Sequence, residues 1–155
     1  MRRASLAAIG TIGLLITVGL TAYAAAAQQG KKTRPLTIRM YGARISTGEY
    51  VFKVVDSLDG TGAAITRVIS STPAGFPDRG TSVTTIYFRD GLSKQKISFT
   101  QDAPNSKGIS PFRGHGKCAG GTGIHKHEKC TYTFKGTYSV ITSQNDLRIA
   151  GTDTR

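Results

Sequence analysis

The sequence predicts an all-β protein whose strands close into a small antiparallel barrel. Three observations support this: a cleanly alternating segment near the C-terminus, short β segments spaced by turn signals, and no helical periodicity after Gly30. Short strands at regular spacing are typical of a β-sandwich or a β-barrel. An apolar N-terminal segment adds a hydrophobic signal helix in front of the barrel.

The clearest strand covers residues 130–141. Its odd positions are hydroxyl-bearing or charged, except for Ile141. Side chains on an extended chain point alternately to its two sides, so the apolar even positions are expected to face the interior. Gly136, in the middle of the strand, is expected to mark a bend or a β-bulge. The apolar face consists of Cys130, Tyr132, Phe134, Gly136, Tyr138 and Val140.

Six further segments have the composition of strands, and turn signals rich in Gly, Pro, Asp and Asn separate them. Asp90-Gly91 lies between two alternating runs and predicts a hairpin, because type I′ turns need residues that accept positive φ. The expected strands are residues 36–41, 49–56, 63–70, 81–89, 94–101 and 147–150. The turn signals are residues 59–62, 73–78, 90–91 and 104–108.

The N-terminus has the order of a secretory signal peptide. Arg2 and Arg3 precede an apolar stretch over residues 6–21, and small residues follow. An uncleaved membrane anchor is the alternative, since a span needs about 20 apolar residues. We favour cleavage near residues 24–27, which gives a signal peptide (1–27), a flexible lead-in (28–35) and a barrel domain (36–155). The expected location is secreted or periplasmic.

The cysteines are expected to form one structural disulfide. Cys118 and Cys130 are the only cysteines of the chain, and exported proteins commonly oxidise such pairs. Thiol exchange would require a closely spaced Cys-x-x-Cys pair, which these positions do not provide. The glycines of residues 114–123 are interpreted as a turn in front of the last long strand. A phosphate-binding loop would open onto a helix N-terminus, and no helix is predicted there.

The segment from Gly114 to Gly123, GHGKCAGGTG, resembles the G-x-G-[basic]-[aromatic]-x-G-x-x-G segment of dirigent-like and allene oxide cyclase-like barrel proteins. The resemblance implies an antiparallel barrel of about eight strands with a central cavity, often exported and frequently oligomeric. Cys118 stands where those families carry an aromatic residue, so a covalent link would replace a packing contact. Their catalytic residues have no assignable positions in this sequence, and their activities are not carried over.

The histidines raise the alternative of a zinc site. On a continuous strand His125 and His127 would share one face, but that face is opposite to Cys130 and would point to water. Neighbouring lysines add positive charge beside the imagined cation. We therefore predict no metal and no cofactor, and interpret the histidines as surface residues beside a disulfide. The residues considered as ligands are His115, Cys118, His125, His127 and Cys130.

No catalytic constellation can be assembled from residue spacing, so catalytic residues stay unknown. The nine acidic residues are scattered, without paired carboxylates, a Ser-His-Asp order or a nucleophile elbow. A cyclase or isomerase is an alternative, because a shaped cavity can accelerate cyclisation by orientation alone. The residues expected to line such a cavity are Tyr87, Tyr132, Phe134 and Tyr138.

The chain is strongly basic, with a formal net charge of +12. Such a charge favours anionic partners such as cell-surface polymers or lipid headgroups, whereas export argues against nucleic acid. The preferred prediction is an exported barrel that binds a small apolar ligand or has a structural role in the envelope. The alternatives are a barrel enzyme and a cationic protein held on an anionic polymer. Membrane contact is expected only through the signal segment, and a homo-oligomer is compatible with the sequence.

Overall fold

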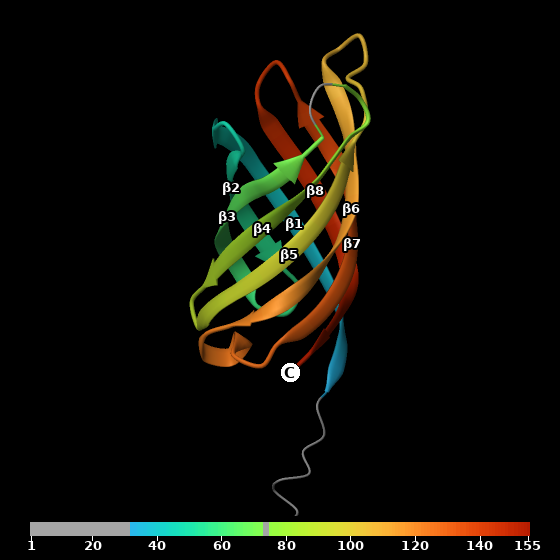
Figure 1. Cartoon of the computed structure of the whole chain (residues 1–155). Helices are drawn as coiled ribbons and strands as arrows, with labels where there is room; N and C mark the ends of the chain where they lie inside the picture. The colour runs from blue at the N-terminus through green and yellow to red at the C-terminus, as the bar shows by residue number, and fades with distance from the viewer. Residues whose placement is uncertain (1–31, 73–74) are drawn as a thin grey trace, which may run out of the picture. The chain divides into compact units, whose positions relative to one another are not determined.

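The computed structural model describes residues 32–72 and 75–155, which form one closed barrel of eight strands. Each strand pairs antiparallel with the next, and the first pairs with the last, so the described sheet has no open edge (Figure 1). The prediction of an all-β antiparallel barrel with about eight strands is therefore confirmed. The predicted signal helix and residues 1–31 lie outside the described residues.

The strands follow one another with short connections. No helix in residues 32–72 and 75–155 is long and apolar enough to span a membrane. The elements are β1 (Thr33–Ser46), β2 (Glu49–Asp56), β3 (Gly60–Ser71), β4 (Asp78–Phe88), β5 (Gly91–Gln101), β6 (Ile109–Gly121), the short 3₁₀ helix η1 (Gly123–His125), β7 (Lys129–Ser139) and β8 (Gln144–Thr154).

The barrel has two chemically different ends. One end, which we call the mouth, carries the β1–β2, β3–β4, β5–β6 and β7–β8 connections. The other end, which we call the base, carries the β2–β3 and β4–β5 turns, the η1 loop, and the first and last residues of the barrel (Figure 1). Up-and-down connectivity places alternate connections at opposite ends, so the two ends can be specialised separately.

Alternation along each strand separates the interior from the surface. In β7, Cys130, Tyr132, Phe134 and Tyr138 are buried, whereas Thr131, Thr133, Lys135 and Thr137 are exposed, as predicted from parity. The interior core continues on neighbouring strands with Leu36, Ile38, Met40, Phe52, Val54, Ala64, Ile86, Phe99, Leu147 and Ile149.

The predicted bulge at Gly136 is absent. This glycine pairs regularly with Phe112 on β6 and with Leu147 on β8. A Cβ atom at this position would lie 2.8 Å from Leu147 Cδ2 and would also collide with the backbone oxygen of Asp146. Glycine is therefore required here for close approach of the neighbouring strand, not for a change of register.

The glycine-rich segment was predicted as a turn, and this prediction is wrong over most of its length. Residues 114–121 lie in β6 and run beside β5, and residues 114–117 also pair with β7. A Cβ atom at Gly114 would lie 2.6 Å from Phe134 Cζ, and one at Gly116 would fall on the ring of Tyr132. The glycines leave room for the aromatic rings of β7, and the true turn begins at Thr122.

The barrel also begins earlier than predicted. Residues 33–35, assigned to the flexible lead-in, belong to β1 and pair with residues 152–154 of β8. The Asp90-Gly91 signal was correct for a hairpin, with Gly91 paired to Phe88 across the β4–β5 turn. Gly91 has a φ of 145°, a conformation that favours glycine.

Candidate functional site

The mouth half of the barrel interior holds a cavity of 390 Å³. Its lining begins among mouth residues such as Thr47, Gly48 and Ser71 and extends inward to Tyr132 on β7 and Ile149 on β8. Below these residues the interior is filled by Ile38, Val54 and Ile86, which are 1% exposed or less. The cavity is thus a deep cup within the size range of small-molecule sites.

Aromatic rings form much of the cavity wall. The ring centroids of Phe99 and Phe112 are 5.2 Å apart, and those of Phe112 and Phe134 are 5.5 Å apart. Tilted aromatic pairs at these separations are mutually stabilising. Tyr50 and Tyr138 meet edge-to-face nearer the mouth at 6.3 Å. The other apolar lining residues are Met40, Phe52, Val68, Ile69, Ile97, Leu147 and Ile149.

A few polar groups interrupt this apolar lining. Asn145 is buried, and its Nδ2 atom has no hydrogen-bond partner among the described residues. Thr66 and Thr84 share a hydrogen bond of 2.7 Å between their hydroxyls. Burial raises the pKa of the Tyr50 phenol, with a smaller contribution from the phenol of Tyr138, so the Tyr50 hydroxyl remains a donor. The site therefore presents hydrogen-bond donors on an apolar background.

The structure places three of the four expected cavity residues, Tyr132, Phe134 and Tyr138, in the lining. The fourth prediction is wrong, because Tyr87 points outward and is 47% exposed. On β4 the inward face carries Ser82, Thr84 and Ile86, whereas the outward face carries Val83 and Tyr87. The parity rule assumes that the inward side chains of a strand are apolar. It fails on β4, because the inward side chains include the hydroxyls of Ser82 and Thr84.

Sequence reasoning missed Phe112 and Asn145. Phe112 lies in residues 109–113, which were not predicted as strand; the same segment contains Pro111, and proline is uncommon inside strands. Asn145 precedes the predicted strand 147–150, although β8 begins at Gln144. Alternation extended backward from Leu147 would have placed Asn145 on the inner face.

The predicted disulfide is present directly below the cavity. Cys118 on β6 and Cys130 at the start of β7 are bonded, with Cα atoms 4.9 Å apart. The hydroxyl of Tyr132 donates a 2.7 Å hydrogen bond to Gln95 Oε1 in the same layer. Burial raises the pKa of the Tyr132 phenol well above its usual value, with a smaller contribution from Glu128, so the phenol stays neutral.

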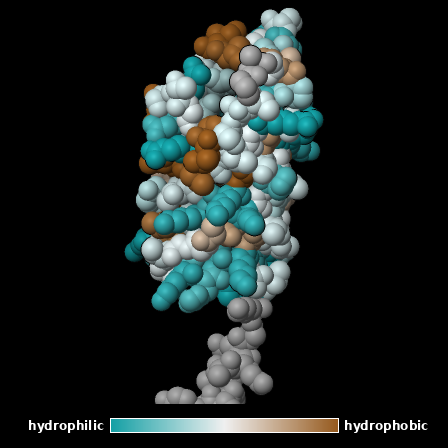
Figure 2. Space-filling model, viewed as in Figure 1, coloured by the Kyte–Doolittle hydropathy of each residue, from teal (hydrophilic) through white to brown (hydrophobic). Residues whose placement is uncertain are grey.

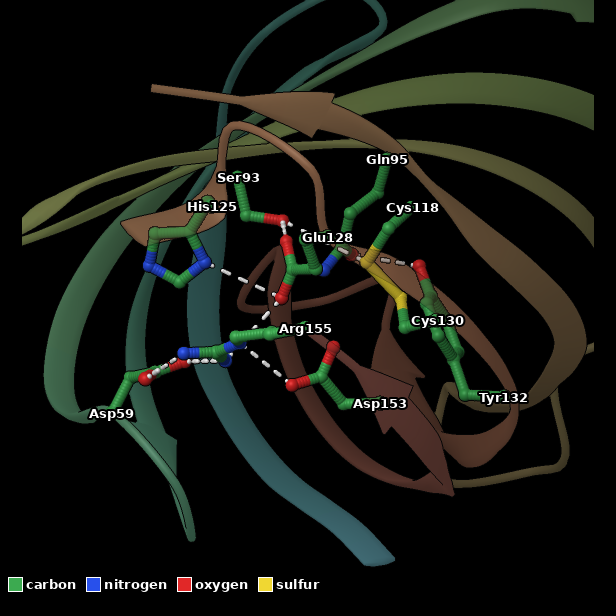
Figure 3. The surroundings of a disulfide bond; sticks show 10 residues. All are labelled: Asp59, Ser93, Gln95, Cys118, His125, Glu128, Cys130, Tyr132, Asp153 and Arg155. Atoms are coloured by element: carbon green, nitrogen blue, oxygen red, sulfur yellow. Dashed lines mark hydrogen bonds and ion pairs between the residues drawn. A yellow bond between two sulfur atoms is a disulfide. The ribbon is translucent and has the colours of Figure 1, made fainter. Parts of the chain in front are cut away.

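A buried ion-pair cluster closes the base (Figure 3). The guanidinium of Arg155 lies among three carboxylates: it donates to Asp59 and contacts Asp153 at 2.7 Å and Glu128 at 3.4 Å. Ser93 Oγ donates a 2.5 Å hydrogen bond to the second oxygen of Glu128. The hydrogen bonds that Arg155 donates to Asp59, followed by the nearby negative charges, raise the pKa of Arg155 further above its usual value.

His125 belongs to this cluster, and the prediction that it faces water is wrong. The residue lies in η1 instead of on a strand, is fully buried, and stacks against Phe88 with centroids 5.1 Å apart. Its Nδ1 atom is 3.3 Å from Glu128 Oε1. His115 and His127 are exposed, as expected. The five candidate zinc ligands therefore do not form one group.

Asp59, His125 and Glu128 offer ligand atoms within 4.8 Å of one another, which is compatible with a metal site. However, the Arg155 guanidinium already contacts both carboxylates and supplies a fixed positive charge at this position. A divalent cation would have to displace that charge, because like charges repel strongly in a buried setting. We interpret the cluster as a structural plug of the base.

The cavity itself offers little for acid–base catalysis. Among the described residues that line it, Asp78 is the only charged side chain, and it lies near the mouth. General acid–base chemistry requires a proton donor and an acceptor positioned on either side of the substrate. The arrangement is suited to enclosing an apolar molecule and orienting one polar group.

These features define a closed eight-stranded antiparallel barrel with a plugged base and an apolar cavity at its mouth. Comparisons of the chain with protein-family models, with curated proteins and with solved structures gave no match.

Proposed function

We propose that this protein binds a small, mainly apolar molecule inside the mouth half of its barrel. The observation that carries the proposal is the 390 Å³ cavity, walled by aromatic and aliphatic side chains. Sites of this size and lining commonly bury most of a small ligand, and a few polar groups then fix its orientation. Burial of the apolar surface of the ligand provides the driving force.

The positions of the polar groups define the chemistry of the ligand. Its apolar body would lie against Phe99, Phe112 and Phe134, where the lining is aromatic. Its polar group would be a hydrogen-bond acceptor, such as a carbonyl or an ether oxygen, that meets the unpartnered Nδ2 donor of Asn145. A buried donor without a partner is costly, so an acceptor at this point contributes to affinity and orientation.

The proposal includes export of the protein and a relationship to dirigent-like and allene oxide cyclase-like barrels. The Cys118–Cys130 disulfide supports an oxidising compartment, since such bonds seldom persist in the cytosol. The closed barrel with an internal cavity is the architecture that the resemblance implies. Fold alone does not carry an activity from one protein to another, so we propose binding without turnover.

Binding of the neutral fluorescent probe N-phenyl-1-naphthylamine tests the proposal. We expect saturable fluorescence enhancement with the wild-type protein and its loss in Ser82→Phe, which places a phenyl group in the cavity from a buried lining position. Val83→Phe is the matched control, because Val83 is the next residue of β4 and points outward. Equal probe binding by the two variants, with both folded by circular dichroism, would reject the cavity as the site.

A further inference from the structure

The mouth carries exposed apolar side chains near three of its four connections, which we call the apolar rim: Ile45, Ile69, Phe76, Val140 and Ile141. Ile141, Ile69 and Ile45 are the most exposed large apolar residues of the described chain, at 75%, 61% and 58%. Figure 2 shows apolar atoms at the upper end of the molecule, where Figure 1 places the β7–β8 connection, and hydrophilic atoms gathered near the base. Exposed apolar groups gathered around a cavity entrance mark an interaction surface.

Two rim residues owe their exposure to breaks in the barrel register. On β1, Arg44 pairs with Tyr50 and Ser46 with Glu49, so Ile45 is the extra residue of a bulge. On β3, Val68 pairs with Ser82 and Ser70 with Thr81, which makes Ile69 the extra residue of a second bulge. Bulges redirect side chains at barrel ends. Both bulges at the mouth therefore turn an isoleucine away from the regular pairing.

Unpaired basic residues accompany the rim. Arg44 N donates to the carbonyl of Ser143, which places Arg44 beside the β7–β8 turn. Lys107 lies next to Gly108, whose added Cβ would be 2.8 Å from Ile141 Cδ1. Arg79 is the second residue of β4, on the other side of the mouth. Within the described chain, Arg44, Arg79 and Lys107 form no ion pair with an acidic side chain.

The acidic residues of this end offset these charges only in part: Asp78 at the start of β4 and Asp146 near the start of β8 form no ion pair within the described chain. Glu49 pairs with Arg67, and Asp102 pairs with Arg113. Four of the nine acidic residues, Asp56, Asp59, Glu128 and Asp153, are withdrawn from the surface at the base. The rim thus combines projecting apolar tips with basic side chains, the pattern of proteins that rest on anionic lipid surfaces.

We propose that the apolar rim docks the mouth of the barrel onto an anionic lipid bilayer. Ile45, Ile69 and Ile141 would enter the interface between headgroups and acyl chains, while Arg44, Arg79 and Lys107 meet lipid phosphates. In this orientation the cavity opens to the lipid phase, so its ligand would be exchanged with the bilayer instead of with water. That last step rests on the proposed function, whereas the docking itself does not.

The test uses introduced tryptophan, because the chain contains none. Ile141→Trp reports on the rim, and Ile124→Trp reports on an exposed apolar position in η1 at the base. Each full-length variant is mixed with vesicles of phosphatidylcholine and phosphatidylglycerol that carry brominated acyl chains. We expect a blue shift and quenching of the emission for I141W and no change for I124W. The comparison holds even if residues 1–31 contact the vesicle, since both variants contain them.

Charge reversal supplies the second arm of the test. Adding Arg44→Glu and Lys107→Glu to I141W should raise the vesicle concentration needed for half-maximal quenching by at least about tenfold. Ser82→Phe in the same background should leave the quenching unchanged, so failure of ligand binding and failure of docking are distinguishable. If the emission of I141W does not shift with vesicles, the proposal is overturned. That result is expected if the partner of the rim is a protein. Equal quenching of I124W, or no effect of the charge reversals, also overturns it.

Discussion

The carboxylate of Asp59 receives two hydrogen bonds from the guanidinium of Arg155, which lies 96 residues later in the chain. This contact joins the β2–β3 turn to the C-terminal side of β8 across the base of the barrel. Because Asp153 and Glu128 surround the same guanidinium, one cation compensates three carboxylates. The base is therefore closed by a buried ion-pair cluster, whereas the cavity lies in the mouth half of the barrel.

Loss of this cation should destabilise the barrel strongly. Arg155→Met leaves three carboxylates close together without a counter-charge, and breaking a buried ion pair costs about 3–5 kcal/mol. We expect the free energy of unfolding in urea at neutral pH to fall by about that amount.

Arg113→Gln is the matched control for this substitution. Its ion pair with Asp102 is bidentate as well, but the Arg113 side chain is 57% exposed. Exposed ion pairs contribute little to stability, because solvent screens them. If R113Q and R155M lowered the stability equally, the special role of the basal cluster would be refuted.

Asp56 should give the protein a component of stability that decreases as pH rises. Burial, reinforced by the charge of Asp59, raises the pKa of this carboxyl above 3.8 in the folded state. A raised pKa means that the folded protein prefers the neutral form, so stability is lost between pH 3.8 and the raised pKa. Asp56→Asn keeps an acceptor for the Leu58 N–H and should stabilise the protein at pH 7.

The contribution of Glu49 to stability has the opposite dependence on pH, and the same experiment measures it. Its hydrogen bonds from Arg67 and then Ser46 lower its pKa below 4.5. Its contribution is therefore present above pH 4.5 and is lost as the pH falls through the lowered pKa. Urea unfolding from pH 3 to 8 should show D56N above and Glu49→Gln below the wild type at neutral pH, with both differences vanishing in acid. A D56N variant that is less stable at pH 7 would contradict the assignment.

The strands differ in how well their sequence pattern indicates which side chains face the interior. Parity correctly oriented β7 because its inward residues are aromatic and its outward residues are polar. The same rule failed on β4, where Ser82 and Thr84 point inward and Val83 and Tyr87 point outward. A cavity tolerates hydroxyls inside, and exposed apolar residues are common on barrel walls, so local pattern was insufficient.

The residues of the candidate site could be predicted from the sequence only in part, for a related reason. Tyr132, Phe134 and Tyr138 could be placed inside from one strand, whereas the cavity also depends on Phe112 and Asn145 from strands whose bounds were missed. The basal cluster depends on long-range pairs such as Asp59 with Arg155, and no local spacing signals them. His125 was misplaced because η1 replaces the expected strand and turns its ring inward.

Removal of the disulfide should weaken the barrel without abolishing it. Cys118 and Cys130 are separated by 12 positions, and the chain-entropy relation gives such a loop about 3 kcal/mol. Replacing both cysteines by alanine should lower the free energy of unfolding by about this amount, while the β-type circular dichroism is retained. Intact mass spectrometry of the native protein with and without reductant checks that the disulfide is present. Free thiols in the native protein would contradict this structure.

The last prediction concerns why β6 is rich in glycine. A Cβ atom at Gly116 would overlap the ring of Tyr132, with Cε2 only 2.6 Å away. Gly116→Ala should therefore destabilise the protein by about 1–3 kcal/mol, the usual cost of overpacking a filled interior. If the clash is the cause, Tyr132→Leu should be less damaging in the G116A background than in the wild type, since the shorter side chain makes room for the methyl group. Urea unfolding of the two single variants and the double variant measures this coupling.

His115→Ala, at the exposed position beside Gly116, is the control and should change the stability by less than about 0.5 kcal/mol. Additive effects of G116A and Y132L would show that the glycine is not there to accommodate the ring.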